Sequence, residues 1–186
     1  MNKQPEVTDA TRAAFIEVFC ELYKEKPAEK ITVKQIVERA GYSRATFYHY
    51  FHDVYDVLEY AEETFLSSLM ENIARNIQTG LPLEHFSTAF IHLVQKERKN
   101  IDLFLSNANS TAFMNKLQNK IIPMLIREFG ISPENNYAIY ALKFYSAGII
   151  SVMGSWEKDG QAISLDKIAD LTKGILREGV LKQLTV

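Results

Sequence analysis

A short segment, residues 43–51, concentrates side chains that can bind nucleic acid. Arg44 supplies a positive charge, and Tyr48 and His49 add hydrogen-bonding groups within two helical turns. Two phenylalanines lie four residues apart in this segment, so a helix would place both on one side and the polar groups on the other. The major groove of DNA admits a helix, and such groups contact phosphates and base edges. The segment therefore predicts a recognition helix.

The preceding residues predict a second helix and a turn that position this one. Thr32 is suited to cap a helix, and Gly41 follows where the chain needs a residue that tolerates a positive φ. The inward positions of this helix are Ile36, Val37 and Ala40. Ser43 is the expected N-cap of the recognition helix. Two short helices joined by a glycine turn form a helix-turn-helix pattern.

At these positions the sequence resembles the tetracycline-repressor (TetR) family of transcriptional regulators. The family pattern Thr-Val-x-x-Ile-x-x-x-Ala-Gly and Ser-x-x-Thr-Phe-Tyr-x-x-Phe corresponds here to Thr32, Val33, Ile36, Ala40, Gly41, Ser43, Thr46, Phe47, Tyr48 and Phe51. The resemblance spans roughly residues 8–58. It implies a DNA-binding head, a body that binds a small effector and a homodimer.

We expect Arg44 to read a guanine or bind a phosphate, and Thr46 and His49 to touch bases or backbone. The expected DNA-contacting residues are Thr32, Tyr42, Ser43, Arg44, Thr46, Tyr48 and His49. For each tyrosine, packing is the alternative role. The expected partner is a pseudo-palindromic operator in double-stranded DNA, bound by a dimer that acts as a repressor.

One departure from the family pattern affects this expectation. The family usually has a lysine near the start of the fourth helix, where this chain has Val54. The following turns are acidic, with Asp56, Glu59, Glu62 and Glu63. A missing cation lowers the sequence-independent part of DNA affinity and its salt dependence. A rival hypothesis is therefore a protein of the same fold that has weak or lost DNA binding and works through a protein partner.

The composition is typical of a soluble protein, and its charge balance gives little support for DNA binding. The chain has 186 residues, 47% of them apolar, and a net charge of −2. Residues 1–52 hold eight Lys and Arg against seven Asp and Glu. Cys20 is the only cysteine, so no disulfide framework exists, and a core role is expected rather than redox sensing. The apolar stretch 147–153 is too short to span a bilayer, which predicts a cytoplasmic protein without membrane contact.

The apolar periodicity predicts an all-α protein with about nine helices. Beyond the two helices in 31–51, the expected helices span about 8–26, 53–78, 83–99, 101–105, 111–129, 133–158 and 164–184. Pro123 is expected to disturb one of them. The expected division is a three-helix head, residues 1–52, and a larger effector-binding and dimerisation body, residues 53–186. The helix over 53–78 belongs to both.

The last two expected helices, 133–158 and 164–184, carry more apolar residues than one buried face needs. By resemblance to the family, they form a four-helix dimer interface with the same helices of a second copy. The expected interface residues are Ile149, Val152, Met153, Trp156, Leu171 and Ile175. Ordinary core packing is the alternative for about half of the apolar positions. Residues 144–160 also resemble a family subgroup that includes dihydroxyacetone-kinase regulators.

The family resemblance implies an effector site inside the body. The candidate lining residues are Phe65, Phe86, Phe90, His92, Phe104, Phe113, Tyr140 and Tyr145, and core packing is the alternative for most of them. His85 and His92 lie seven residues apart, but no cysteine or carboxylate has a matching ligand spacing, so no metal site is expected. No phosphate-binding glycine motif occurs. We therefore expect no cofactor and no enzymatic activity, with a helical carrier or enzyme as the remaining rival.

Overall fold

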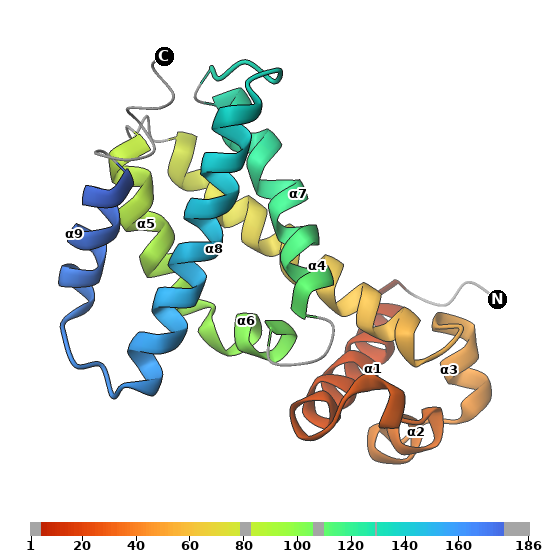
Figure 1. Ribbon diagram of the computed structural model, residues 1–186. Coiled ribbons are helices and arrows are strands. Elements are labelled where there is room, and N and C mark those ends of the chain that lie inside the picture. Colours follow the sequence, from red (N-terminus) through yellow and green to blue (C-terminus); the bar gives the residue numbers. More distant parts are fainter. Residues whose placement is uncertain (1–4, 79–82, 106–109, 129, 177–186) are drawn as a thin grey trace.

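A computed structural model describes residues 5–78, 83–105, 110–128 and 130–176. All regular structure in these ranges is helical, which confirms the predicted all-α class. The helices in chain order are α1 (Pro5–Glu25), the 3-10 turn η1 (Ala28–Lys30), α2 (Val33–Ala40), α3 (Arg44–Tyr50), α4 (Val54–Gln78), α5 (Leu83–Lys96), α6 (Arg98–Leu105), α7 (Ser110–Glu128), α8 (Asn136–Lys158) and α9 (Leu165–Ile175). Helices α1 to α3 form a head beside the larger body, and α4 runs from one into the other (Figure 1).

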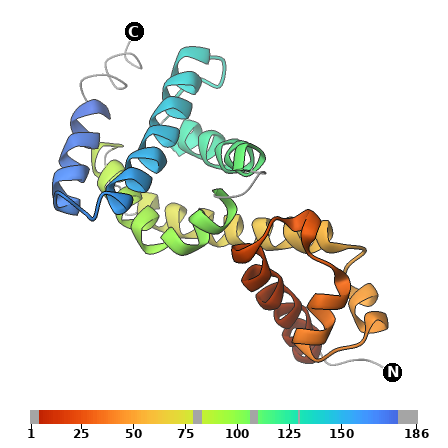
Figure 2. The same cartoon turned by 60° about the horizontal axis from the view of Figure 1, so that its bottom comes forward.

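The head packs around a small aromatic and aliphatic centre. Helix α1 lies against α2 and against the start of α4, and α2 packs on α3. Its fully buried side chains include Phe15, Phe19, Ile36 and Phe47. The turned view in Figure 2 also shows the head extending from the body, with α4 as the continuous connection. The orientation of α3 is therefore set by its packing on α2 and by the contact of Phe47 with Phe15 of α1.

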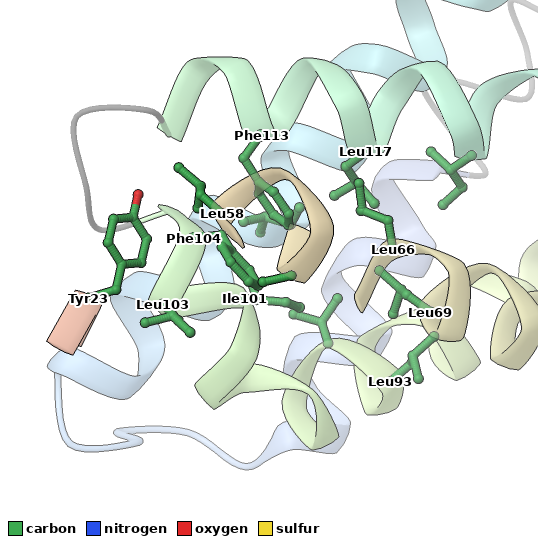
Figure 3. Packing of buried hydrophobic residues seen from close by; sticks show 14 of the residues in the cluster. Tyr23, Leu58, Leu66, Leu69, Leu93, Ile101, Leu103, Phe104, Phe113 and Leu117 are labelled. Atoms are coloured by element: carbon green, nitrogen blue, oxygen red, sulfur yellow. The ribbon is translucent and has the colours of Figure 1, made fainter. Parts of the chain in front are cut away.

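The body surrounds α4 with helices from the rest of the chain. Helix α7 packs on α4, α6 and α8, while α5 packs on α4, α8 and α9. Figure 3 shows Leu66 and Leu69 of α4 in the same buried cluster as Leu93 of α5 and Phe113 of α7. Helix α6 also packs against α1, so head and body touch at a second place besides α4.

Helices α1, α6 and α8 each start about three residues from the predicted position, and the shifts of α6 and α8 have local causes. The helix expected over 83–99 ends at Lys96, and α6 begins at Arg98 because the Glu97 carbonyl accepts the N–H of Ile101 at 3.0 Å. Helix α8 begins at Asn136, not near residue 133, because the Asn135 side chain caps it through the Ala138 N–H at 3.0 Å. The part of the last predicted helix beyond residue 176 lies outside the described residues.

Helix α8 is apolar along most of its length. By length and composition, Asn136–Trp156 could cross a membrane, with a mean hydropathy of 1.2. Its inner sides pack on α5 and α7 instead, as in the core helix of a soluble protein. This packing accounts for the apolar residues on the inner sides of α8.

Candidate nucleic-acid interface

The turn between α2 and α3 has the geometry that the sequence predicts. Thr32 and Gln35 form a capping box, in which the Gln35 N–H donates to Thr32 Oγ1 at 3.3 Å and the Thr32 N–H donates to Gln35 Oε1 at 3.0 Å. Gly41 ends α2 with φ of 74° and ψ of 28°, the left-handed conformation that glycine adopts without strain. Ser43 then caps α3 by accepting the Thr46 N–H at 3.0 Å. These local bonds fix where α3 starts.

The side chains predicted to read DNA share the outer face of α3. Arg44, Tyr48 and His49 are exposed, with Tyr48 at 57% of its full exposure, whereas Thr46 is half-buried. The Ser43 and Thr46 hydroxyls lie 2.8 Å apart and bond to each other. Arg44 forms no ion pair with any residue that the structure describes. The face thus offers one cation, an imidazole and a phenol hydroxyl to a ligand.

An aromatic cluster holds the opposite side of α3 in place. Phe47 is fully buried and packs edge-on against Phe15 of α1, with ring centroids 5.4 Å apart. Phe51 lies 5.7 Å from Phe47, and Tyr42 lies 5.2 Å from Phe15. Aromatic pairs at these separations add specific geometry to apolar burial. A rigid base of this kind lets α3 present its polar face in one orientation.

Arg12 connects α1 to the ends of α3 and α4. Its guanidinium lies 5.7 Å from the ring centre of Tyr50 and 5.2 Å from that of Tyr60. It also donates to the Tyr60 hydroxyl at 3.3 Å. Cation–π contacts of this kind contribute to stability at partly exposed sites. Arg12 therefore holds the recognition helix to α4 and is not available as a simple phosphate anchor.

The start of α4 carries carboxylates instead of a cation. Val54 is buried and belongs to the core. Asp53 accepts the Asp56 N–H at 2.9 Å, and Asp56 accepts the His52 N–H at 2.8 Å. Asp53 therefore caps α4, and Asp56 binds the N–H of His52, the residue before the cap. A helix N-terminus ordinarily attracts phosphate, but two carboxylates at this one oppose it.

The predicted pocket residues in the body mostly form packed core. Phe65, Phe104 and Phe113 come from three helices, and the rings of Phe104 and Phe113 stack with centroids 5.0 Å apart (Figure 3). Phe90 and Tyr145 are buried, and the Tyr145 hydroxyl donates to the Thr172 carbonyl at 3.0 Å.

Of the three remaining predicted pocket residues, Tyr140 and His92 lie outside this packed core. Tyr140 is 71% exposed, so its predicted place inside the body is wrong. The side chain of Phe86 lies outside the part of the chain that the structure describes. His92 lines a separate hollow of about 380 Å³ with Asn72 and Arg75. Among the described residues, no group of three or more His, Cys, Asp or Glu is placed to hold a metal ion.

The predicted dimer residues divide into two groups. Ile149, Met153 and Trp156 are buried inside the protomer, and the Trp156 Nε1–H donates to the Ile163 carbonyl at 2.6 Å. Their predicted place on an outer interface is wrong, because α5 and α7 cover that side of α8. Val152 is half-buried, while Leu171 and Ile175 are exposed on α9.

The structure adds exposed aromatic residues that were not among the predicted interface positions. Tyr137 and Phe144 lie on the same outer side of α8 as Tyr140, with exposures of 60% and 72%. Their spacing of three, four and seven residues marks one helical face. The sequence contained this signal, but it also contained an equally apolar inner face, and only the fold tells the two apart.

The structure also adds charged contacts between α4 and α7. Glu62 is buried and pairs with Lys116 at 2.8 Å, and Glu63 pairs with Lys120 at 2.5 Å. Burial, together with the nearby negative charges of Glu62 and Glu29, raises the pKa of Tyr23 to about 12. Tyr23 belongs to α1 and lies beside Leu103 and Phe104 of α6 (Figure 3). A buried polar group therefore sits where head meets body.

Cys20 lies half-buried in α1. Burial raises the pKa of its thiol to about 11, although nearby Lys24 acts in the opposite direction. A thiol with this pKa is almost entirely protonated at neutral pH and reacts slowly. The environment is that of a core residue.

The head thus has the parts of a helix-turn-helix DNA-binding module, with an exposed polar helix on a rigid aromatic base. Residues 15–61 match the family described as "Bacterial regulatory proteins, tetR family", and residues 82–178 match a "Transcriptional regulator C-terminal region". The chain belongs to the TetR family of transcriptional regulators. This is a family of regulators and not of enzymes.

Solved structures share this fold over nearly the whole chain. The fatty acid degradation regulator FadR from Bacillus halodurans has a TM-score of 0.66 and 16% identity, with 97% of this chain and 98% of that chain covered. A putative TetR-family transcriptional regulator from Syntrophomonas wolfei strain Goettingen has a TM-score of 0.65 and 13% identity, with 93% and 96% covered. At these identities the likeness concerns the fold. A comparison with curated proteins gave no match.

Proposed function

We propose that this regulator is a homodimeric repressor that binds a pseudo-palindromic DNA operator and releases it when the body binds a small effector. The observation that carries the proposal is the outer face of α3, where Arg44, Tyr48 and His49 are exposed together on a fixed aromatic base. Arg44 would contact a guanine or a phosphate, and Tyr48 a phosphate. Thr32, Tyr42, Ser43 and Thr46 would position the module through their caps and packing, besides any contact with DNA.

A dimer is proposed because one short helix reads few base pairs. Two copies related by a two-fold axis would place two recognition helices about 34–36 Å apart, which matches successive turns of DNA. The exposed apolar residues of α8 and α9 support this arrangement and are Tyr137, Tyr140, Phe144, Leu171 and Ile175. A large exposed apolar patch commonly marks an interaction surface. Helix α9 lies on the side of the body away from the head, and α8 runs between α9 and α7 (Figures 1 and 2).

In this proposal the two functions separate at the predicted domain boundary. Residues 1–52 would bind DNA, and residues 53–186 would bind the effector and the second copy. Helix α4 joins the two parts without interruption. Movement of α4 in the body would therefore change the position of α3. Binding to chromosomal DNA would place the protein in the cytoplasm of a bacterial cell.

A second candidate function is regulation through a protein partner with weak or lost DNA binding. The observation in its favour is the start of α4, where Val54 is buried and Asp53 and Asp56 cap the helix. With no cation there, fewer phosphates are neutralised, and both the affinity and its salt dependence fall.

The two candidates are separated by selecting binding sites from random DNA and measuring affinity at several salt concentrations. Arg44→Ala is the test variant, and the matched control is Arg39→Ala, which removes an exposed arginine of α2. We expect a palindromic site, a loss of affinity of at least about 10-fold (about 1.4 kcal/mol in total) with Arg44→Ala, and a smaller loss with the control. Failure to enrich any sequence at low salt would favour the protein partner.

A further inference from the structure

A groove of about 670 Å³ runs between α7 and α8, next to the turn that joins them. Its apolar lining comes from both helices and the turn and consists of Ile122, Pro123, Ile126, Ile131, Pro133 and Ile139. The volume lies within the range of small-molecule sites. None of the aromatic residues predicted to bind the effector lines this groove.

The spacing of the two helices at the groove is fixed by a buried amide. Gln118 of α7 is buried, and its Nε2 donates to the Lys143 carbonyl at 3.0 Å and to Ser146 Oγ at 3.2 Å, both on α8. Ser146 in turn donates to the same Lys143 carbonyl at 3.0 Å. A buried network whose members all have partners holds a defined geometry. The groove is therefore a built feature of the α7–α8 pair.

The charged side chains that line the groove are both cations, Arg127 from α7 and Lys143 from α8. Arg127 is exposed and bonds to its neighbour Glu128 at 2.8 Å, so part of its charge is already balanced. Lys143 is half-buried and lines the groove together with the apolar residues. An apolar trough with cations at its side is complementary to a molecule that has an apolar body and one negative end.

We propose that this groove binds an amphipathic small molecule with an apolar body and a single carboxylate or phosphate group, and that this molecule is the effector of the regulator. The effector role rests on the proposed function. The apolar body would cover the isoleucines of α7 and α8. The anionic group would pair with Lys143 and, after exchange of its bond to Glu128, with Arg127.

The same helix that lines the groove is tied to the helix that carries the head. Lys116 and Lys120 of α7 pair with Glu62 and Glu63 of α4. A ligand that shifts α7 would therefore act on α4 through both pairs. Because α4 continues into the head, this connection gives the ligand a route to α3.

The groove is tested on the full-length chain by isothermal titration calorimetry with decanoate, decyl phosphate and neutral 1-decanol. The test variant is Lys143→Met with Arg127→Gln, and the matched control is Lys158→Met, an exposed lysine of α8 outside the groove. We expect the variant to lower affinity for the anions about 10-fold or more, and to leave 1-decanol and the control unchanged. The preferred anion identifies the head group.

Three results would overturn the proposal. The first is no binding of either anion at millimolar concentration, and the second is binding that the groove variant does not change. The third is a shift of the monomer–dimer equilibrium by Ile126→Asp without loss of anion binding, which would assign the groove to a second copy. A gel shift on the selected DNA, with and without the anion, tests the effector role separately. Anion binding without DNA release overturns only that role, whereas absence of DNA binding overturns the proposed function and leaves the calorimetric result standing.

Discussion

The head and the body present opposite kinds of surface. On the head, the outer face of α3 is polar, and its apolar residues point inward to Phe15. On the body, the outer face of α8 is apolar, with Phe144 and Tyr140 among the most exposed large side chains. A polar helix face suits a hydrated, charged ligand such as DNA, whereas an apolar face is costly until another protein covers it. The comparison supports the proposal that the head binds DNA and the body binds a second copy of the chain.

The largest effect is expected where a charge is placed on the apolar face of the body. Phe144→Glu should convert the proposed dimer into monomers and lower affinity for a palindromic site by about 100-fold or more, because one head then binds without the other. Sedimentation velocity gives the mass and gel shifts give the affinity. The control is Tyr55→Glu, which also replaces an exposed aromatic residue by an acid but lies on α4 next to the head. It should leave the mass unchanged. A dimeric Phe144→Glu variant would contradict the proposed interface.

The next effect concerns the contacts between α4 and α7. Lys116→Met leaves Glu62 buried without its partner and should reduce the free energy of unfolding by about 2 kcal/mol. Lys120→Met removes a more exposed pair and should cost less than about 1 kcal/mol. Urea denaturation measures both. Equal losses of unfolding free energy in the two variants would mean that Lys116 stabilises the buried Glu62 carboxylate very little.

The boundary between head and body should respond to alkaline pH. The pKa of Tyr23 is raised to about 12, so the folded state keeps its proton while the unfolded chain loses it near pH 10. The contribution of Tyr23 to stability is therefore constant below about pH 10 and falls as the pH rises from 10 to 12, by about 2 kcal/mol. Tyr23→Phe should remove this part of the slope. Cys20, whose pKa is raised from 9.0 to about 11, supplies a separate fall between about pH 9 and 11 that remains in the variant.

The smallest effect compares two helix caps. Thr32→Ala breaks the capping box of α2 and should cost about 1 kcal/mol. Ser164→Ala removes the cap of α9, a single bond of 3.4 Å to the Lys167 N–H, and should cost less. Thermal unfolding of both variants measures the difference. If Ser164→Ala proved the more damaging change, local capping would matter more to the body than to the head.

The head was predictable because its information is local. Gly41, Ser43 and Thr32 each act on residues within four positions of themselves, and the structure has each of them in the predicted role. The residues on the inner side of α3 follow from the helical repeat alone.

For the body, the sequence predicts the helices but not which side of each helix is buried and which is exposed. In α8 both Met153 and Phe144 are apolar, and the sequence does not say which of them α5 and α7 will cover. The same reason explains Tyr140, which is as aromatic as Phe113 but lies outside. Contacts such as Lys116 with Glu62 join residues 54 positions apart, and no local pattern predicts them.

Helix α4 has 25 residues without a break, which corresponds to a length of about 37 Å. A tilt of about 5° around its C-terminal end in the body would move its N-terminal end at the head by roughly 3 Å. This distance is close to the rise of one base pair along a DNA strand. The two recognition helices of a dimer would then stand out of phase with their half-sites. A change of angle too small to disturb the packing of the body is thus large enough to mismatch the distance between the two recognition helices and the distance between the half-sites on DNA.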